Sequence, residues 1–116
     1  MRELYQAIKK EVNSEQFRAS EIYGSINHSD HESYAVILEE FDEADRERRM
    51  FALDLEAFWM YCKTDHNDEN PKDKREILAT LSERAVRAAC EWVQVAAMCK
   101  KATETLNNRT DYEEQE

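Results

Sequence analysis

A near absence of helix-breaking residues constrains this chain more than any other feature. One glycine, Gly24, and one proline, Pro71, occur among its 116 residues. Glycine and proline mark turns, so a chain with so few of them has little capacity for the many turns of a β-rich fold. Alanine, glutamate, leucine, arginine and lysine, which favour helices, are abundant instead. We therefore expect an all-α protein with few connections between its helices.

Three segments carry apolar residues at the three- and four-residue spacing of an amphipathic helix. The spacing predicts a short helix over residues 2–19 and long helices over 30–63 and 72–106. Ser29 and Glu32 form an S-x-x-E capping box before the second helix. A polar linker that ends at the candidate cap Asn70 leads into the third helix. The apolar stripe of the second helix thins at residues 45–49, where a kink or break is possible.

The two long helices carry more apolar surface than a hairpin can bury. About 34 residues at 1.5 Å each span roughly 50 Å, which exceeds the width of a compact domain of this size. Residues 85–99 are apolar almost all the way round their helix, which is typical of a helix buried on more than one side. We therefore predict two long antiparallel helices plus a short N-terminal helix, and a four-helix-bundle core completed by oligomerisation. The expected homo-oligomer is a dimer or a dimer of dimers.

The domain organisation expected from this pattern is a single domain over residues 1–116. Residues 1–23 contain the N-terminal helix, residues 24–106 form the core, and residues 107–116 form an acidic, frayed tail.

Charge and cysteine content narrow the partners and the compartment. A formal net charge of −10 disfavours binding to nucleic acid or to an anionic membrane surface. No apolar run reaches the roughly 18 residues of a transmembrane helix, and the N-terminus lacks the apolar core of a signal peptide. Cys62, Cys90 and Cys99 form no C-x-x-C pair, so we interpret them as reduced, mostly buried residues of a cytoplasmic protein.

An E-E-x-x-E cluster, Glu39, Glu40 and Glu43, begins the most informative pattern. On a helix, positions 40 and 43 lie about 60° apart, and positions 39 and 43 about 40° apart. Glu40 lies on the flank of the apolar stripe, and Glu91, followed one turn later by Gln94, flanks the stripe of the third helix. Antiparallel packing would bring these flanks together in a groove. Clustered carboxylates repel unless a divalent cation neutralises them, and Mg²⁺ takes such oxygen ligands.

Other interpretations of these residues are less specific. Asp and Glu make up 26 of the 116 residues, so E-E-x-x-E also arises on the solvated face of an acidic helix. Residues 28–32 contain histidines and acids, but their spacing is unlike a closed zinc site and suits exposed helix-start residues. Trp59 and Trp92 have rings that can stack a nucleobase. Their place on apolar stripes favours packing in the core or at a subunit interface.

Two stretches of the sequence resemble a known family. YGSINHSDHESYAVILEEFDEA (residues 23–44) and ERAVRAACEWVQVAAMCKKA (residues 83–102) are similar to the MazG-like, all-α nucleoside triphosphate pyrophosphohydrolase superfamily. That family's pattern is E-E-x-x-E on one helix and E-x-x-D on a later helix, which together bind Mg²⁺. The resemblance covers roughly residues 24–106, and the chain looks especially like the short stand-alone versions common in bacteria and their phages.

Residue by residue, the resemblance implies cation binding by Glu40, Glu43 and Glu91, with Glu39 assisting. The chain departs from the pattern at Gln94, where the family has Asp. An amide oxygen can ligate a cation, but it is neutral and a weaker partner for a hard ion. The implied activity is Mg²⁺-dependent hydrolysis of an NTP or dNTP to the monophosphate and pyrophosphate, with Mn²⁺ as a substitute.

That chemistry assigns further roles. A carboxylate must orient the water that attacks the α-phosphorus, and Glu39 or Glu43 is the predicted residue. Positive side chains are needed for the outer phosphates, and Arg87, Lys100 and Lys101 are the predicted contacts. Each of these is also readable as a solvated or salt-bridged surface charge. Further basic candidates at the start of the third helix are Lys72, Lys74 and Arg75.

The departure at position 94 supports an alternative function. The chain would then be a catalytically degenerate helical oligomer of the same family. Such a protein would bind nucleotide or metal without turnover, or act as a protein-interaction module.

Overall fold

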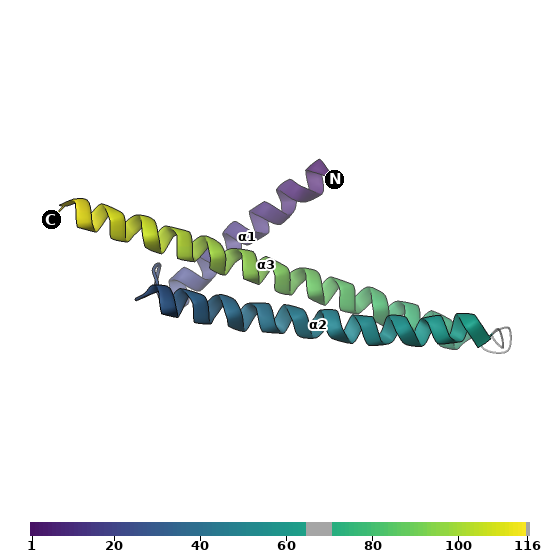
Figure 1. The fold of residues 1–116 in the computed structure, drawn as a ribbon. Helices are drawn as coiled ribbons and strands as arrows, with labels where there is room; N and C mark the ends of the chain where they lie inside the picture. Colours follow the sequence, from purple (N-terminus) through teal and green to yellow (C-terminus); the bar gives the residue numbers. More distant parts are fainter. Residues whose placement is uncertain (65–70, 116) are drawn as a thin grey trace. The chain divides into compact units, whose positions relative to one another are not determined.

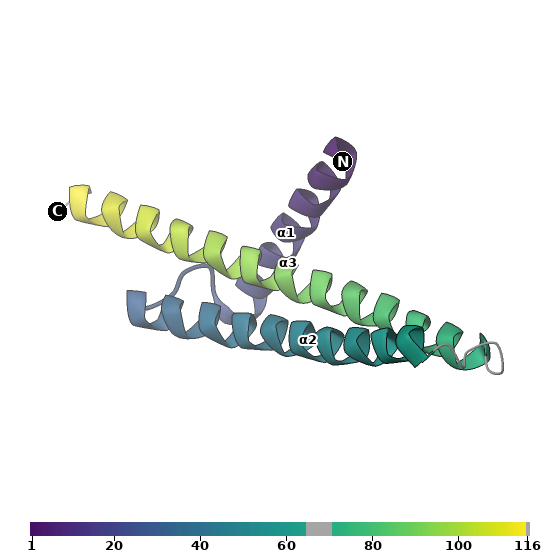
Figure 2. The same ribbon diagram turned by 45° about the vertical axis from the view of Figure 1, so that its right-hand side comes forward.

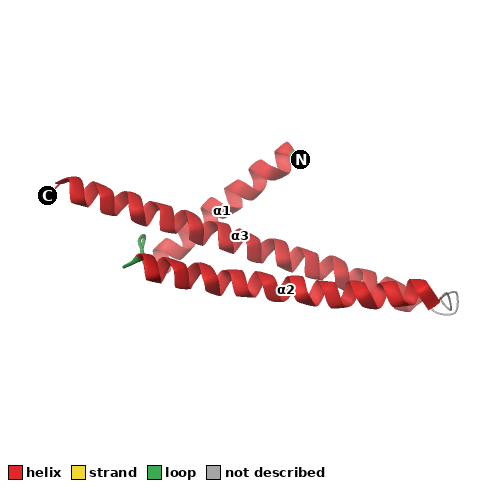
Figure 3. Ribbon diagram, in the orientation of Figure 1, coloured by secondary structure: helices red, strands yellow, loops and turns green. Residues whose placement is uncertain are grey.

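The computed structural model spans residues 1–116 and describes residues 1–64 and 71–115. All regular structure in these residues is helical, and no strand is present (Figure 3). The three helices are α1 (Arg2–Tyr23), α2 (Asp30–Thr64) and α3 (Pro71–Gln115) (Figure 1). The prediction of an all-α chain with one shorter and two long helices is therefore confirmed for the described residues.

The helices extend further than the apolar periodicity predicts. α1 continues past residue 19 to Tyr23, and α3 continues past residue 106 to Gln115. The predicted tail is therefore helical as far as Gln115, since no glycine or proline interrupts it. α2 runs without a break through residues 45–49. The predicted linker, with its cap candidate Asn70, lies outside the described residues at 65–70.

The connection between α1 and α2 is held at both ends. Gly24 ends α1 with a φ of 93°, which L side chains rarely adopt, and its N–H donates to the Ser20 carbonyl at 3.0 Å. At the start of α2, the Ser29 hydroxyl accepts the Glu32 N–H at 3.1 Å. The Glu32 carboxylate accepts the His28 N–H at 3.2 Å. The predicted capping box is thus present, except that the Glu32 carboxylate accepts the N–H of His28 and not that of the cap residue Ser29.

The chain divides into two compact units, Met1–Asp42 with Glu91–Glu116 and Glu43–Cys90. We call them the first and the second unit. The first unit contains α1, the beginning of α2 and the end of α3 (Figure 2). The second unit contains the remainder of α2 beside the beginning of α3. In each unit the α2 and α3 segments run antiparallel, as predicted.

Two alanines and a methionine form the buried core cluster of the first unit. Ala19 of α1 packs with Ala97 and Met98 of α3, and Val36 and Ile37 of α2 are among the residues packed against this cluster. Ala97 is fully buried. Its methyl side chain needs little space, so the helices can approach closely at this point.

A buried polar cluster joins the start of α2 to the end of α3 within the first unit. The fully buried Thr105 accepts the Asn27 N–H at 2.9 Å and donates its hydroxyl to the Lys101 carbonyl at 2.9 Å. The Asn27 side-chain amide donates to the Ser33 hydroxyl at 2.7 Å. Asn27 and Ser33 are buried as well. Because water cannot replace a lost partner here, each of these hydrogen bonds contributes to holding the connection against α3.

Thr105→Val is expected to lower the free energy of unfolding by about 1–3 kcal/mol. Valine keeps the shape of threonine but leaves the buried Asn27 N–H without its acceptor. Urea unfolding followed by circular dichroism measures the change. Thr105→Ser keeps the hydroxyl and serves as the matched control, with a smaller loss. Equal losses in the two variants would show that the hydroxyl does not stabilise this connection.

The second unit has little buried apolar surface of its own. Ala44 and Leu81 are the buried hydrophobic residues among those of this unit that the structure describes. An ion-pair group joins its two helices instead: Arg84 of α3 hydrogen bonds to Asp54 of α2 and lies 3.9 Å from a carboxylate oxygen of Glu47. Partly exposed ion pairs contribute modestly to stability. Because so few of its apolar residues are buried, the hairpin of the second unit presents much apolar surface to its surroundings.

Many residues of the predicted apolar stripes are exposed in the single chain. Trp59 and Trp92 are 57% and 47% exposed. Cys62, Cys90 and Cys99 are free thiols and all three are exposed, so the prediction that they are mostly buried is wrong for the isolated chain. The physical reason is that each helix has apolar residues on more than one side, while each unit covers only part of that surface. Further exposed apolar residues of α2 are Tyr34, Leu38, Phe41, Met50, Leu53, Leu55, Met60 and Tyr61.

Length alone does not make these helices membrane spans. α2 and α3 contain 35 and 45 residues, but charged residues recur along both. In the described part of the chain, no helix combines the length and the apolar character needed to cross a membrane.

Candidate metal centre

The structure brings together carboxylates that lie far apart in the sequence. In the first unit, α2 supplies Glu40 and α3 supplies Glu91, and oxygen atoms of the two lie within 4.8 Å of each other. Glu43 follows Glu40 by one turn of the same unbroken helix and is the first residue of the second unit. We call Glu40 and Glu91, with Glu43 one turn further along α2, the acidic group. Among the described residues, it is the group of histidine, cysteine or acidic side chains whose spacing suits a metal ion.

Aromatic packing holds the two helices together beside these carboxylates. Phe41 follows Glu40 and Trp92 follows Glu91, and their rings meet edge to face with centroids 6.1 Å apart and an interplanar angle of 73°. Such a pair contributes about 0.5–1.5 kcal/mol beyond its buried area. One carboxylate oxygen of Glu91, Oε2, is shut off from solvent. The local packing therefore places carboxylate oxygens in a partly dry environment, where charge interactions are stronger.

The spacing of the acidic group fits a small, hard divalent cation. Mg²⁺ holds oxygen ligands octahedrally at about 2.1 Å, so oxygens around one ion lie about 3–4.2 Å apart. Carboxylate oxygens within 4.8 Å of one another reach that spacing by small side-chain rotations. All the donors are oxygen atoms of acids, which suits Mg²⁺ or Mn²⁺ better than a metal that prefers sulfur or imidazole.

Gln94 lies on α3 one turn after Glu91, and a residue of α1 holds it in position. Its side-chain nitrogen Nε2 donates to Oε2 of Glu15 at 2.8 Å. The same oxygen of Glu15 accepts a hydrogen bond from Arg18 at 2.9 Å. The Arg18 hydrogen bond, and after it the Gln94 hydrogen bond, lower the pKa of the Glu15 carboxyl despite its partial burial. Glu15 therefore stays ionised at a lower pH than an isolated glutamate.

The other predicted acid, Glu39, takes no part in this group. Glu39 is exposed on α2, whereas Glu40 is half-buried. The difference follows from the helical period, because neighbouring residues lie about 100° apart around a helix.

The three predicted phosphate contacts lie in three different environments. Arg87 is exposed in the second unit and pairs with Glu83 at 3.2 Å. Lys100 donates to the Asn13 side chain of α1 and borders a cavity of about 400 Å³ in the first unit. Lys101 is 5% exposed, so its side chain faces the interior of the first unit.

Glu32, at the predicted start of the second helix, makes contacts that stabilise the start of α2. Glu32 completes the capping box, where its carboxylate accepts the His28 N–H. Residues 28–32 form no metal-binding group of three in the described part of the chain.

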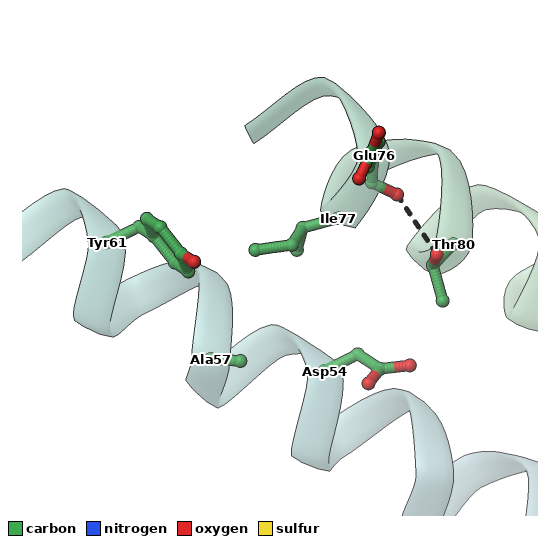
Figure 4. Close-up of a pocket in the computed structure, with 6 residues that line it drawn as sticks. All are labelled: Asp54, Ala57, Tyr61, Glu76, Ile77 and Thr80. Atoms are coloured by element: carbon green, nitrogen blue, oxygen red, sulfur yellow. Dashed lines mark hydrogen bonds between the residues drawn. The ribbon is translucent and has the colours of Figure 1, made fainter. Parts of the chain in front are cut away.

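A cavity in the second unit is lined by none of the predicted site residues that the structure describes. The cavity lies between α2 and α3 and has a volume of about 290 Å³. Figure 4 shows the side chains that line it and the hydrogen bond from the Thr80 hydroxyl to the backbone carbonyl of Glu76, whose length is 3.0 Å. Asp54, one of the two acids in its lining, already pairs with Arg84. The acidic group, whose carboxylate oxygens have a spacing that suits a cation, is therefore the better candidate site. The lining residues are Asp54, Ala57, Tyr61, Glu76, Ile77 and Thr80.

Comparison with known proteins adds no relative. No protein-family model matches the chain, and neither a curated protein nor a solved structure matches it. The MazG-like resemblance therefore stays a prediction from the residues themselves.

Sequence patterns missed the role of Glu15. Its pairing with Arg18, three residues later on one helix, is readable from the sequence. Its contact with Gln94 joins residues 79 positions apart, and no local pattern encodes which polar residue of α1 meets α3.

Proposed function

We propose that this protein is a Mg²⁺-dependent nucleoside triphosphate pyrophosphohydrolase. The observation that carries the proposal is the meeting of Glu40 and Glu91, from helices far apart in the sequence, with Glu43 one turn further along α2. The E-E-x-x-E and E-x-x-Q patterns that resemble the MazG-like superfamily contain all three residues. The spacing argument and the resemblance thus point to the same side chains.

The proposed chemistry is cleavage of the bond between the α-phosphorus and the oxygen that bridges to the β-phosphate. A bound Mg²⁺ would neutralise negative charge on the phosphate oxygens. Glu40 and Glu91 hold the cation, and Glu43 orients the attacking water and accepts its proton. We assign that role to Glu43 rather than Glu39 because Glu43 lies about 60° from Glu40 round α2, whereas Glu39 lies about 100° from it. The water oxygen bonds to the α-phosphorus, and pyrophosphate leaves from a nucleoside monophosphate.

Among the basic candidates, we propose Arg87 as the contact for the outer phosphates. It lies one turn before Glu91 on α3 and about 40° round the helix. Lys100 lies about 180° from Glu91 and donates to Asn13 instead. Lys101 is buried within the first unit. Arg87 is thus the exposed basic side chain on the Glu91 side of α3.

A homo-oligomer is part of the proposal. The exposed apolar residues of α2 and α3 exceed what a stable isolated hairpin leaves uncovered. A second copy of the chain would cover them and complete a four-helix bundle. We place the protein in the cytoplasm, where its three free thiols would stay reduced and nucleotides are available.

One observation favours the alternative of a catalytically degenerate binding protein. The residue at the last acidic position of the family pattern is Gln94, and its amide nitrogen donates to Glu15. A neutral residue held by another acid supplies less charge to a cation than the family's Asp would.

Pyrophosphate release from a panel of NTPs and dNTPs tests the proposal. We expect release with Mg²⁺ or Mn²⁺, none with EDTA, and a rate that differs between bases and sugars. A folded protein that binds Mn²⁺ but releases no pyrophosphate from any nucleotide would instead establish the binding function.

A further inference from the structure

The hydrogen bond between Gln94 and Glu15 lies within the first unit and links α1 to the helix that carries Glu91. The two side chains meet at 2.8 Å, and the contact is partly buried. Glu15 is itself held by Arg18, which donates through both Nε and Nη2 to its carboxylate. The carboxylate that faces Gln94 is therefore anchored within α1 and can hold the Gln94 side chain in one orientation.

This hydrogen bond determines which end of the Gln94 amide faces Glu15. An ionised carboxylate only accepts hydrogen bonds, so the NH₂ group must point at Glu15 and the carbonyl oxygen Oε1 must point away from it. Gln94 lies one turn after Glu91 and about 60° round α3. An oxygen atom is thus presented on the part of the helix surface that also carries the Glu91 carboxylate.

We propose that Glu15 is a positioning residue for the cation site, which orients Gln94 so that its Oε1 ligates the cation held by Glu40 and Glu91. This inference rests on the proposed function, since it assumes that a cation binds there. Glu15 itself does not contact the ion. Partners that orient metal ligands in this manner typically change metal affinity by about 10- to 100-fold when they are removed.

The same pair accounts for the glutamine at position 94. An aspartate there would place two carboxylates next to each other, and like charges at that distance cannot both ionise readily. Only one of positions 15 and 94 can therefore carry a negative charge without this repulsion. In this chain Glu15 carries it, and Gln94 supplies a neutral oxygen.

Mn²⁺ affinity of the full chain, measured by electron paramagnetic resonance without nucleotide, tests the inference. Glu15→Ala is expected to weaken Mn²⁺ binding by about tenfold. Glu15→Gln keeps an acceptor for the Gln94 amide and is expected to stay within about threefold of the wild type. Glu11→Ala removes an exposed acid one turn earlier on α1 and is the matched control for loss of charge.

The side-chain amide resonance of Gln94 in the metal-free protein gives a second, independent reading. It should shift in Glu15→Ala and stay in place in Glu11→Ala.

The outcomes separate this inference from the function on which it rests. If the wild type binds Mn²⁺ and Glu15→Ala binds it equally well, the positioning role is wrong while the cation site stands. If the wild type binds no Mn²⁺, both are overturned, and the Gln94 resonance then reports a purely structural hydrogen bond. Weaker binding in Glu15→Ala, with binding close to that of the wild type in Glu15→Gln and in Glu11→Ala, supports the role of Glu15.

Discussion

Glu40→Gln and Glu91→Gln are each expected to lower metal-dependent pyrophosphate release by at least about 100-fold. Each substitution keeps the size of the side chain and removes one negative charge from carboxylates whose oxygens lie within 4.8 Å of each other. A neutral amide binds a hard cation more weakly, so the charge on the substrate phosphates is less well neutralised. The measurement is pyrophosphate release with saturating nucleotide over a range of Mg²⁺ concentrations.

Raising the Mg²⁺ concentration should recover part of the activity of either variant, because the defect is in holding the cation. Glu56→Gln, an exposed acid further along α2, is the matched control and should keep the wild-type rate. Thermal unfolding of all three proteins checks that each is folded. Full activity in both Glu40→Gln and Glu91→Gln would contradict the proposal that the acidic group holds the cation.

The helices and their order were predictable because their causes are local. Apolar spacing, the single Gly24 and the Ser29 cap lie within short stretches of sequence, and the structure has helices where these signals predict them. The helix end near residue 106 was predicted too early. Periodicity marks where a helix is buried, whereas a polar helix such as residues 107–115 continues beyond the buried part.

The pairing of α2 with α3 near Glu40 was partly predictable for the same reason. Both acids flank an apolar stripe, so antiparallel packing of the stripes brings the flanks together. The basic residues were harder to place. Lys100 and Lys101 are neighbours in the sequence, but one donates to Asn13 of α1 and the other is buried. One residue turns a helix by about 100°, so a small difference in the packing angle decides which lysine is exposed.

Contacts between distant polar residues had no local signal. The bonds from Gln94 to Glu15 and from Asn27 to Thr105 join positions 79 and 78 residues apart. Each depends on the register between two helices, which side-chain packing decides. Apolar periodicity also could not say what covers a stripe: Trp59 lies on the predicted stripe, yet it is 57% exposed in the single chain.

That exposure leads to the second large effect, on assembly. The wild type is expected to have at least twice the 13.7 kDa mass of one chain in solution. Leu55 and Trp59, which are 48% and 57% exposed, lie about 40° apart on α2 of the second unit and form one apolar surface. Changing both to glutamate would place charges in a dry interface, twice over in a symmetric dimer. We expect a monomer at micromolar concentration, as measured by light scattering after size-exclusion chromatography.

Leu53→Glu is the matched control for this experiment. Leu53 is 62% exposed on the same helix but lies about 120° or more round α2 from Leu55 and Trp59. A dimer that uses the Leu55 surface should tolerate a charge at position 53 and keep its mass. The double variant should also unfold at a lower temperature. The second unit has a small core of its own, in which Ala44 and Leu81 are the buried hydrophobic residues among those described, so it would depend on the interface for stability. A wild type that is monomeric, or a double variant that keeps the wild-type mass, would show that a second copy does not cover this surface.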